Sequence, residues 1–363
     1  MQGNRVVWYP DASGEEQWHF PVTEGDVATV LAEDSDYFDS TSFVITCKDG
    51  ALIFLQFVLA NLKPMYTHQI GVHIKYVDPA GKCTVYSNKY DKKSFSLTDD
   101  NTTIHIGGFK IIRQASENGY TIEVDDKQCK KIKGELHVAS NEGGGVKFGD
   151  DGKTSFSEDR SEFSAMFYTI PRATVTGTLV VDGQEVTVDA HGFVSHFTQN
   201  MKPHRVALKW SLMKFHSDDI TLNQNLLLTP KHYNKTVVSH GICVLDNKLL
   251  AVTMDNDIVY PTSEYDKDTG YNVPTSAVYT WKGKTLDGEP FSAKIELTPS
   301  NLIDKVDILG HLPWAIRMII KAFVARPYHY QWLDKATATV TIGDKTFETE
   351  GQALHEVTFV NPE

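Results

Sequence analysis

The chain has 363 residues, a length at which one hydrophobic core usually gives way to two, so two compact domains are expected. Its 47 acidic residues against 35 basic ones leave a formal charge of −12, which opposes phosphate backbones and excludes a general nucleic-acid-binding protein. The four cysteines show no redox or zinc-binding spacing, and the chain begins with no basic segment followed by an apolar run. A cytoplasmic location is therefore expected.

Short runs rich in valine, isoleucine, threonine and aromatic residues recur along the chain, which is typical of an antiparallel all-β protein. Turn-forming pairs between these runs supply the positive φ that tight hairpins need. Such meanders hide their edge strands by closing into barrels or sandwiches. The four pairs that predict hairpins are Asp49-Gly50, Asp182-Gly183, Asp246-Asn247 and Gly343-Asp344.

Two polar segments are expected to lie outside the strands. The first 40 residues carry nine acidic side chains and one basic one, Arg5, which predicts a solvated lead-in that avoids anionic lipid. Residues 139–162 contain five glycines among polar neighbours, which predicts a flexible loop. The strands from 163 to 188 are then expected to complete a first barrel.

A set of residues in the first half recurs 139 positions later, which indicates an internal duplication. A chance match is the alternative. If the duplication is real, the chain divides near residue 190 into an N-terminal domain, 1–189, and a C-terminal domain, 190–363. The first set is Phe54, Asn61, Lys63, Pro64 and Lys75, and the second is Phe193, Asn200, Lys202, Pro203 and Lys214.

The common catalytic and cofactor motifs are absent from the sequence. No Gly-x-Ser-x-Gly elbow, His-Glu-x-x-His helix or Gly-x-Gly-x-x-Gly turn occurs. Asp266, Asp268 and Gly270 have the spacing of the start of a calcium loop, but Ala277 stands where the bidentate glutamate is required. A surface turn is the better interpretation there. We expect no metal and no cofactor.

Three residues with even spacing form a candidate polar face. His204, Trp210 and His216 share one face if a continuous strand runs from Lys202 to His216. That face could line a cavity, with the histidines as polar anchors. Core histidines that are satisfied by hydrogen bonds beside a packing tryptophan are the alternative interpretation.

One segment has the pattern of a helix. It begins at Pro313, a residue favoured at the first helical position, and ends at Ala325, before Pro327. Its surface is apolar almost all round, and Arg317 and Lys321 form the only charged stripe. Two interpretations remain open. The helix plugs or flanks a barrel, or it is a lipid-facing lid whose cations point toward solvent or head groups.

The residues after this helix place aromatic side chains at strand spacing. Tyr328, Tyr330 and Trp332 fall on one face of the expected strand. Such a stripe can belong to the core, or it can join the helix in forming one wall of a lipid cavity.

Several short motifs follow one another along the chain. They are Ile170-Pro171-Arg172 with Gly177-Thr178, Asn200-Met201-Lys202-Pro203-His204 with Trp210 and Phe215-His216-Ser217, Gly270-Tyr271-Asn272-Val273-Pro274, the segment from Leu312-Pro313 through Gln331, Gly343-Asp344, and Glu356-Val357-Thr358-Phe359. Each is weak alone. Their order and spacing from about Phe43 onward, most specifically in the second half, resemble the fungal survival factor proteins.

This resemblance implies a fold and a function. The family has two lipocalin-like domains, is associated with survival under oxidative stress, and carries ceramide from the endoplasmic reticulum toward the Golgi. A ceramide exposes on the order of twenty methylenes, so at roughly 0.8 kcal/mol each its extraction costs well over ten kcal/mol unless an apolar cavity receives its chains. The mouth of a β-barrel can supply such a cavity.

One feature departs from the family, whose members typically begin with an amphipathic helix that attaches to membranes. Residues 1–39 are acidic and show no apolar stripe. Either the segment 313–325 samples membranes in its place, or this member is a soluble paralogue, or the original terminus is missing. We therefore expect only transient membrane contact, through Arg317 and Lys321, at the endoplasmic reticulum or Golgi.

The preferred hypothesis is an all-β protein of two tandem lipocalin-like antiparallel β-barrels and one C-terminal apolar helix. It carries ceramide or a similar long-chain lipid in the second barrel, gated by the helix. The alternatives are a lipocalin-like hydratase or cyclase, with His204 and His216 as acid or base, and an interaction scaffold with filled barrels. The candidate ligand-binding residues are Lys202, His204, Trp210, His216, Trp314, Phe323, Tyr328, Tyr330 and Trp332.

Overall fold

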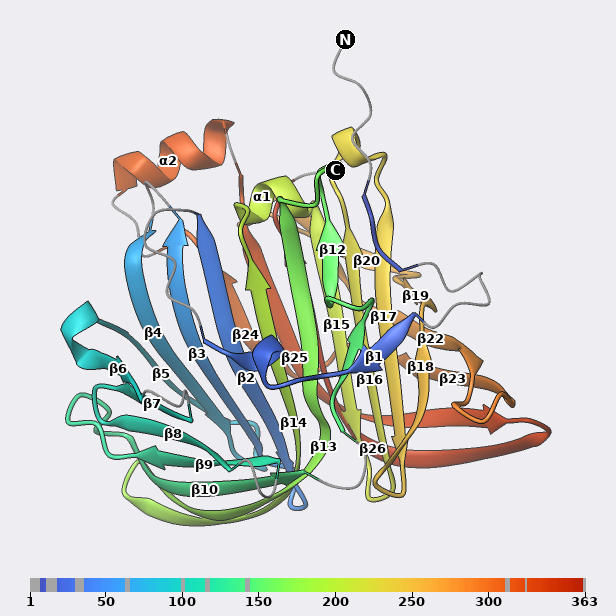
Figure 1. Cartoon of the computed structure of the whole chain (residues 1–363), viewed down its shortest axis with the longest axis horizontal. Coiled ribbons are helices and arrows are strands. Elements are labelled where there is room, and N and C mark those ends of the chain that lie inside the picture. The colour runs from blue at the N-terminus through green and yellow to red at the C-terminus, as the bar shows by residue number, and fades with distance from the viewer. Residues whose placement is uncertain are drawn as a thin grey trace. The chain divides into compact units, whose positions relative to one another are not determined.

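The computed structural model confirms the all-β class and shows two compact units (Figure 1). One unit, which we name the N-terminal barrel, comprises Ser13–Thr154 and Glu162–Met201. The other, the C-terminal barrel, comprises Met1–Ala12, Ser155–Ser161 and Lys202–Glu363. The structure describes residues 7–10, 18–29, 36–62, 66–98, 102–114, 118–140, 144–310, 314–323 and 325–361.

The N-terminal barrel is built on one antiparallel sheet. The main path of neighbouring strands is β5 (Cys83–Tyr90), β4 (Tyr66–Val77), β3 (Leu52–Leu62), β2 (Tyr37–Cys47), β14 (Gln184–Gln199), β13 (Phe163–Val181), β10 (Ile132–Ser140), β9 (Gly119–Val124), β8 (Phe109–Gln114), β7 (Thr103–Ile106) and β6 (Phe95–Leu97). Three short strands lie off this path. They are β1 (His19–Pro21), β11 (Val146–Phe148) and β12 (Lys153–Ser155). β11 and β12 each pair with β13, and β1 pairs with β11.

Side chains at alternate positions of these strands fill the inside of the N-terminal barrel. Phe109 of β8 lies edge-on to Tyr90 of β5, with ring centroids 6.2 Å apart. This contact brings strands near the two ends of the path onto one core. Phe43 meets Phe57 in the same core at 6.2 Å. The sheet is therefore curled into a nearly closed barrel, and aromatic rings pack its middle.

The C-terminal barrel is a second antiparallel sheet. Its path is β18 (Lys248–Thr253), β17 (Val237–Leu245), β16 (Ile220–Leu228), β15 (Lys209–His216), β26 (Lys345–Phe359), β25 (Tyr328–Ile342), β23 (Pro290–Leu297), β22 (Ala277–Lys284) and β19 (Asp255–Val259). The strand β24 (Leu302–Asp307) pairs with β25, and β20 (Ser263–Asp266) with β21 (Tyr271–Pro274) forms a two-stranded sheet of its own. The α-helices that the structure describes in this unit are α1 (Pro203–Val206) and α2 (Trp314–Phe323).

Polar contacts across the interior curl this second sheet as well. The indole Nε1 of Trp281 in β22 donates a 2.8 Å hydrogen bond to the carbonyl of Asn223 in β16. The amide Nε2 of Gln224 donates to the carbonyl of Asp257 in β19 at 3.0 Å. These bonds join the β19–β22 end of the path to β16, so the C-terminal barrel is also nearly closed.

The two sheets share one strand order, which is a structural duplication. The run β5-β4-β3-β2-β14-β13 in the first corresponds to β18-β17-β16-β15-β26-β25 in the second. The match at 139 residues does not reflect this duplication and is wrong, because Phe54 and Phe193 lie in β3 and β14, two different positions of the same sheet. Residue 190, the predicted boundary, lies within β14, and the compact units change between Met201 and Lys202.

The four predicted hairpins are confirmed. Asp182 and Gly183, with φ of 48° and 82°, join β13 to β14. The other three turns join β2 to β3, β17 to β18 and β25 to β26. Figure 1 shows β25 and β26 as one long hairpin.

The prediction of a flexible loop over 139–162 is wrong, because β11 and β12 lie there. Val146, Phe148 and Phe156 are buried apolar anchors in this glycine-rich stretch. A Cβ on Gly145 would meet backbone carbonyls of the neighbouring strand at 2.6 and 2.8 Å, so glycine there permits close packing. The predicted solvated lead-in contains β1, and much of residues 1–39 lies outside the described residues.

Candidate functional site

Three aromatic side chains share the inner face of the C-terminal barrel. Tyr328, Tyr330 and Trp332 alternate along β25, as the sequence predicts, and Trp332 lies opposite His355 of β26. His355 also lies opposite Met213, a core residue, so this face points into the barrel. The rings of Tyr330 and Trp332 stack with centroids 6.0 Å apart and are 2% and 6% exposed. We name these three residues of β25 the aromatic stripe.

The hairpin β20–β21 covers the aromatic stripe. Tyr271 of β21 stacks on Phe359 of β26 with ring centroids 4.4 Å apart. The hydroxyl of Tyr271 donates a 2.7 Å hydrogen bond to the carbonyl of Arg326. Tyr271, Phe359, Tyr330 and Trp332 belong to one buried cluster. The hairpin therefore occupies the position of a lid over the aromatic side chains.

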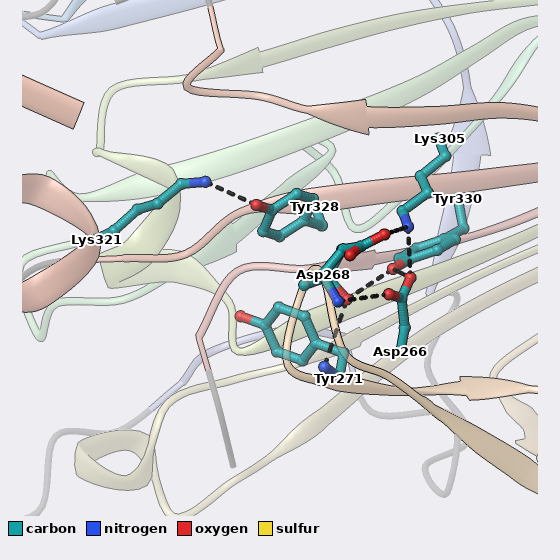
Figure 2. A network of polar contacts seen from close by, with 8 residues as sticks. Asp266, Asp268, Tyr271, Lys305, Lys321, Tyr328 and Tyr330 are labelled. Atoms are coloured by element: carbon teal, nitrogen blue, oxygen red, sulfur yellow. Dashed lines mark hydrogen bonds and ion pairs between the residues drawn. The ribbon is translucent and has the colours of Figure 1, made fainter. Parts of the chain in front are cut away.

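One carboxylate, that of Asp266, fastens this hairpin to the sheet (Figure 2). Its Oδ2 lies 2.7 Å from Nζ of Lys305 and accepts a 2.7 Å hydrogen bond from the hydroxyl of Tyr330. Lys305 of β24 stands opposite Tyr330 in the sheet register. Burial raises the pKa of Asp266, but hydrogen bonds from Lys305 and Tyr330 outweigh burial and bring the pKa to about 2. The carboxylate is charged at neutral pH, and we name these contacts the Asp266 latch.

A buried Asp–His pair lies beside the aromatic stripe. Nε2 of His355 is 2.9 Å from Oδ2 of Asp334, and Nδ1 of His355 is 3.3 Å from the hydroxyl of Tyr279. Trp332 stacks on the imidazole with centroids 5.4 Å apart. Burial raises the pKa of Asp334, but hydrogen bonds from His355 and Ser300 outweigh it and lower the pKa. Asp334 thus stays ionised while it orients the histidine.

Two tyrosine hydroxyls extend this polar layer. Tyr260 donates a 2.8 Å hydrogen bond to the hydroxyl of Ser211. Burial raises the pKa of Tyr260 to about 12 and raises that of Tyr279 well above its ordinary value. Both phenols are therefore neutral at physiological pH. Together with His355 they offer donors and acceptors that suit the amide or hydroxyl of an amphiphilic ligand.

The predicted polar face around Trp210 does not form as expected. Pro203 begins the short helix α1, which contains His204, and β15 begins only at Lys209, so the continuous strand from Lys202 is wrong. Trp210 and His216 alternate with the core residues Met213 and Phe215 and point to the other face of the sheet. Nδ1 of His216 lies 3.0 Å from the hydroxyl of Thr221, as in the satisfied-histidine interpretation.

The predicted apolar helix is present as α2, and its cations contact the protein. Nζ of Lys321 lies 2.6 Å from Oδ2 of Asp307. It also lies 2.7 Å from the hydroxyl of Tyr328 (Figure 2). Arg317 lies 3.8 Å from the same carboxylate. Among the side chains of α2 that the structure describes, Trp314 and Met318 are exposed, at 70% and 49%.

The contacts of Lys321 connect α2 to the end of the aromatic stripe. Membrane contact through Arg317 and Lys321 remains a prediction. The side chain of Phe323, and residues Pro313 and Val324, lie outside what the structure describes.

Sequence reasoning missed Asp334, His355, Tyr260, Tyr279 and the Asp266 latch. Asp334 continues the even spacing of the aromatic stripe, and that spacing is the signal that could have found it. Within the described part of the chain, no three His, Cys, Asp or Glu side chains are grouped so as to hold a metal ion. None of the described helices has the length and apolar character needed to cross a membrane.

The fold is similar to that of three solved proteins. CghA in complex with Sch210972 matches with a TM-score of 0.63 at 11% identity, covering 94% of this chain and 95% of that one. Kievitone hydratase from Nectria haematococca matches with a TM-score of 0.57 at 13% identity, over 94% of both chains. A putative AttH from Nitrosomonas europaea matches with a TM-score of 0.58 at 14% identity, covering 94% and 100%. These likenesses confirm a fold of two lipocalin-like barrels.

Three curated relatives carry the name ceramide-binding protein. The relative from Emericella nidulans is 23% identical over 89% of this chain and 86% of its own length. The relative from Neurospora crassa is 24% identical over 91% and 87%, and that from Schizosaccharomyces pombe is 29% identical over 59% and 58%. The family model of the Svf1 family matches residues 11–361. The chain therefore belongs to the Svf1 family.

Proposed function

We propose that this chain binds and carries ceramide or a similar long-chain lipid, and that it does so without converting it chemically. The proposal draws on the relatives named ceramide-binding proteins. The observation that carries it is the aromatic stripe, a buried apolar face under a hairpin that a few polar contacts hold in place.

The chemistry of this face matches the parts of a ceramide. When the Asp266 latch opens, the β20–β21 hairpin can move away from the aromatic stripe and Phe359. An alkyl chain can then pack against these side chains in its place. Each methylene that leaves water for such a surface contributes roughly 0.8 kcal/mol, so chain burial offsets extraction from a membrane. The hydroxyls of Tyr260 and Tyr279 can hydrogen-bond the amide and hydroxyl groups of the head.

The cellular setting follows from the same proposal. A carrier between the endoplasmic reticulum and the Golgi works from the cytoplasm and touches each membrane transiently. Among the described side chains of α2, Trp314 and Met318 are exposed, apolar and suited to that contact. Survival under oxidative stress would then depend on sphingolipid supply.

Ceramide uptake with mass balance tests this function. Wild-type protein is expected to take labelled ceramide from vesicles and return it unchanged. Trp332→Ala should bind about tenfold or more weakly, because it removes a buried aromatic contact. Because a core Trp→Ala change also costs about 3–5 kcal/mol of stability, Trp332→Phe is measured beside it and should retain most of the affinity. Ceramide binding by folded Trp332→Ala at wild-type strength would contradict the site.

A second candidate function is catalysis on an apolar substrate. The observation that favours it is the buried pair Asp334–His355 with Tyr279 in contact, since a carboxylate that orients a histidine is a common acid–base arrangement. The same mass balance separates the two functions. Recovery of an altered lipid that disappears in His355→Gln would support an enzyme, and complete recovery of ceramide supports a carrier.

A further inference from the structure

The N-terminal barrel contains a recess of about 480 Å³ where the β8–β9 hairpin meets residues 22–27. This volume lies within the rough range of 300–1,000 Å³ that is typical of ligand sites. Val22, Val27 and Ile170 supply apolar lining, and Arg113 and Tyr120 supply polar groups. The lipid site proposed above does not involve these residues.

The strand register explains why Arg113 points into the barrel. Phe109 and Ile111 of β8 are core residues, and Arg113 is the next residue on that face. Tyr120 of β9 lies directly opposite Arg113 in the antiparallel pairing. Its ring packs edge-on against the buried ring of Phe43, with centroids 5.2 Å apart. Arg113 and Tyr120 therefore lie side by side, and the buried ring of Phe43, which we call the aromatic floor, packs beneath Tyr120.

A buried ion pair holds the segment that borders the recess. Nζ of Lys147 lies 2.9 Å from Oδ2 of Asp26, and these side chains are 8% and 13% exposed. The backbone N–H of Thr23 donates to the same carboxylate at 2.7 Å. The backbone N–H of Val22 donates to the carbonyl of Gly145 at 3.0 Å. The wall formed by residues 22–27 is thus fixed in place by one ion pair and by backbone hydrogen bonds.

The positive charge of Arg113 in the recess is not paired with a carboxylate of any residue that the structure describes. Arg113 makes no salt bridge with any described residue, although a guanidinium carries five N–H donors that cannot be deprotonated. Among the described residues of the lining, Glu24 is the acidic one, and it lies exposed. Burial raises the pKa of Tyr120, and the Arg113 charge acts against that rise, so the phenol remains a proton donor beside the cation.

We propose that this recess is a second binding site, which takes a compact oxyanion such as a carboxylate or phosphate. Arg113 would hold the oxyanion through two parallel N–H donors, and the hydroxyl of Tyr120 would add a third hydrogen bond. Val22, Val27 and Ile170 leave room for the first methylenes of an attached chain. The oxyanion is therefore either a free ion or the head group of an amphiphile.

Calorimetric titration of the full chain with octanoate, octanol and inorganic phosphate tests this site. Octanoate or phosphate should bind, and Arg113→Gln should weaken that binding about tenfold or more, because a charge-assisted hydrogen bond is lost. Glu24→Gln should strengthen binding by removing a negative charge. Lys110→Gln is the matched control, since Lys110 lies on the same strand, points to the other face and pairs with Glu123.

Binding of octanoate alone assigns the site to amphiphile head groups, and binding of phosphate alone assigns it to free oxyanions. Three results would overturn the proposal. Octanol binds as tightly as octanoate, or neither anion binds, or wild type and Arg113→Gln bind the anions equally well. Thermal unfolding verifies that each variant is folded. Arg113→Lys, which keeps the charge but lacks the planar fork, gives an intermediate loss if the recognition is bidentate.

Discussion

Asp266 is the residue on which closure of the β20–β21 hairpin depends most. Its carboxylate is held by Lys305 and Tyr330 with a pKa of about 2. A carboxylate whose pKa is lower in the folded state than in the unfolded chain, where it is about 4, adds stability above pH 4. That stability is lost as the pH falls through about 2. The Asp266 latch is therefore fully formed at neutral pH and weakens between about pH 4 and pH 2.

Asp266→Asn is expected to open the hairpin at neutral pH. The loss of a hydrogen-bonded charge costs about 1–3 kcal/mol, so amide hydrogen exchange should quicken by about tenfold at Gly270 and Thr275, whose N–H groups close this hairpin. Asp268→Asn is the control, because Asp268 lies 3.5 Å from Lys305 with its side chain 87% exposed. Equal exchange rates in the two variants would show that Asp266 does not hold the lid.

Local spacing decided which site residues could be predicted from the sequence. The shared face of Tyr328, Tyr330 and Trp332 follows from alternation along one strand and was predictable. His204 was misplaced because Pro203 favours a first helical position, a signal that outweighs even spacing. Contacts between segments far apart in the chain, such as Asp266 with Lys305, leave no local pattern to find.

Among the elements, hairpins with strong turn residues were predictable and short strands were not. Asp182-Gly183 adopts the positive φ that its sequence favours, so the β13–β14 turn could be read directly. β11 and β12 have three residues each and depend on pairing with β13, which sequence periodicity cannot reveal. The helix α2 was predictable from its apolar pattern. The ion pair between Lys321 and Asp307 was not, because it joins two different elements of the fold.

The hairpin β20–β21 is the element expected to set the rate of lipid exchange. Tyr271→Ala removes the stacking on Phe359 and the hydrogen bond to Arg326, so labelled ceramide should both enter and leave the protein faster. Stopped-flow fluorescence with labelled ceramide measures both rates. Tyr265→Ala is the matched control, because Tyr265 belongs to the same hairpin and is 63% exposed. Unchanged rates in Tyr271→Ala would contradict a lid.

At the scale of the whole molecule, one strand order is used twice, and each barrel contains a buried Asp–His pair, which in the N-terminal barrel is Asp39–His196. The C-terminal barrel contains the pair Asp334–His355 under an aromatic stripe. The N-terminal barrel contains an aromatic floor and Arg113. The duplication could not be predicted from matching residues in the sequence. Two sheets with the same strand order need only the same alternation of apolar residues, and that alternation does not require the same residues at corresponding positions. Different side chains on one architecture suit two different ligand chemistries.

Lipid carriage is tested most directly by mass spectrometry of lipid extracted from the full chain after purification without detergent. If the chain carries ceramide, the extract will contain a long-chain lipid of the ceramide type, close to one molecule per chain, and Trp332→Ala will lose this lipid. Protein that comes out without any long-chain lipid, and that afterwards takes up no labelled ceramide from vesicles, would contradict lipid carriage.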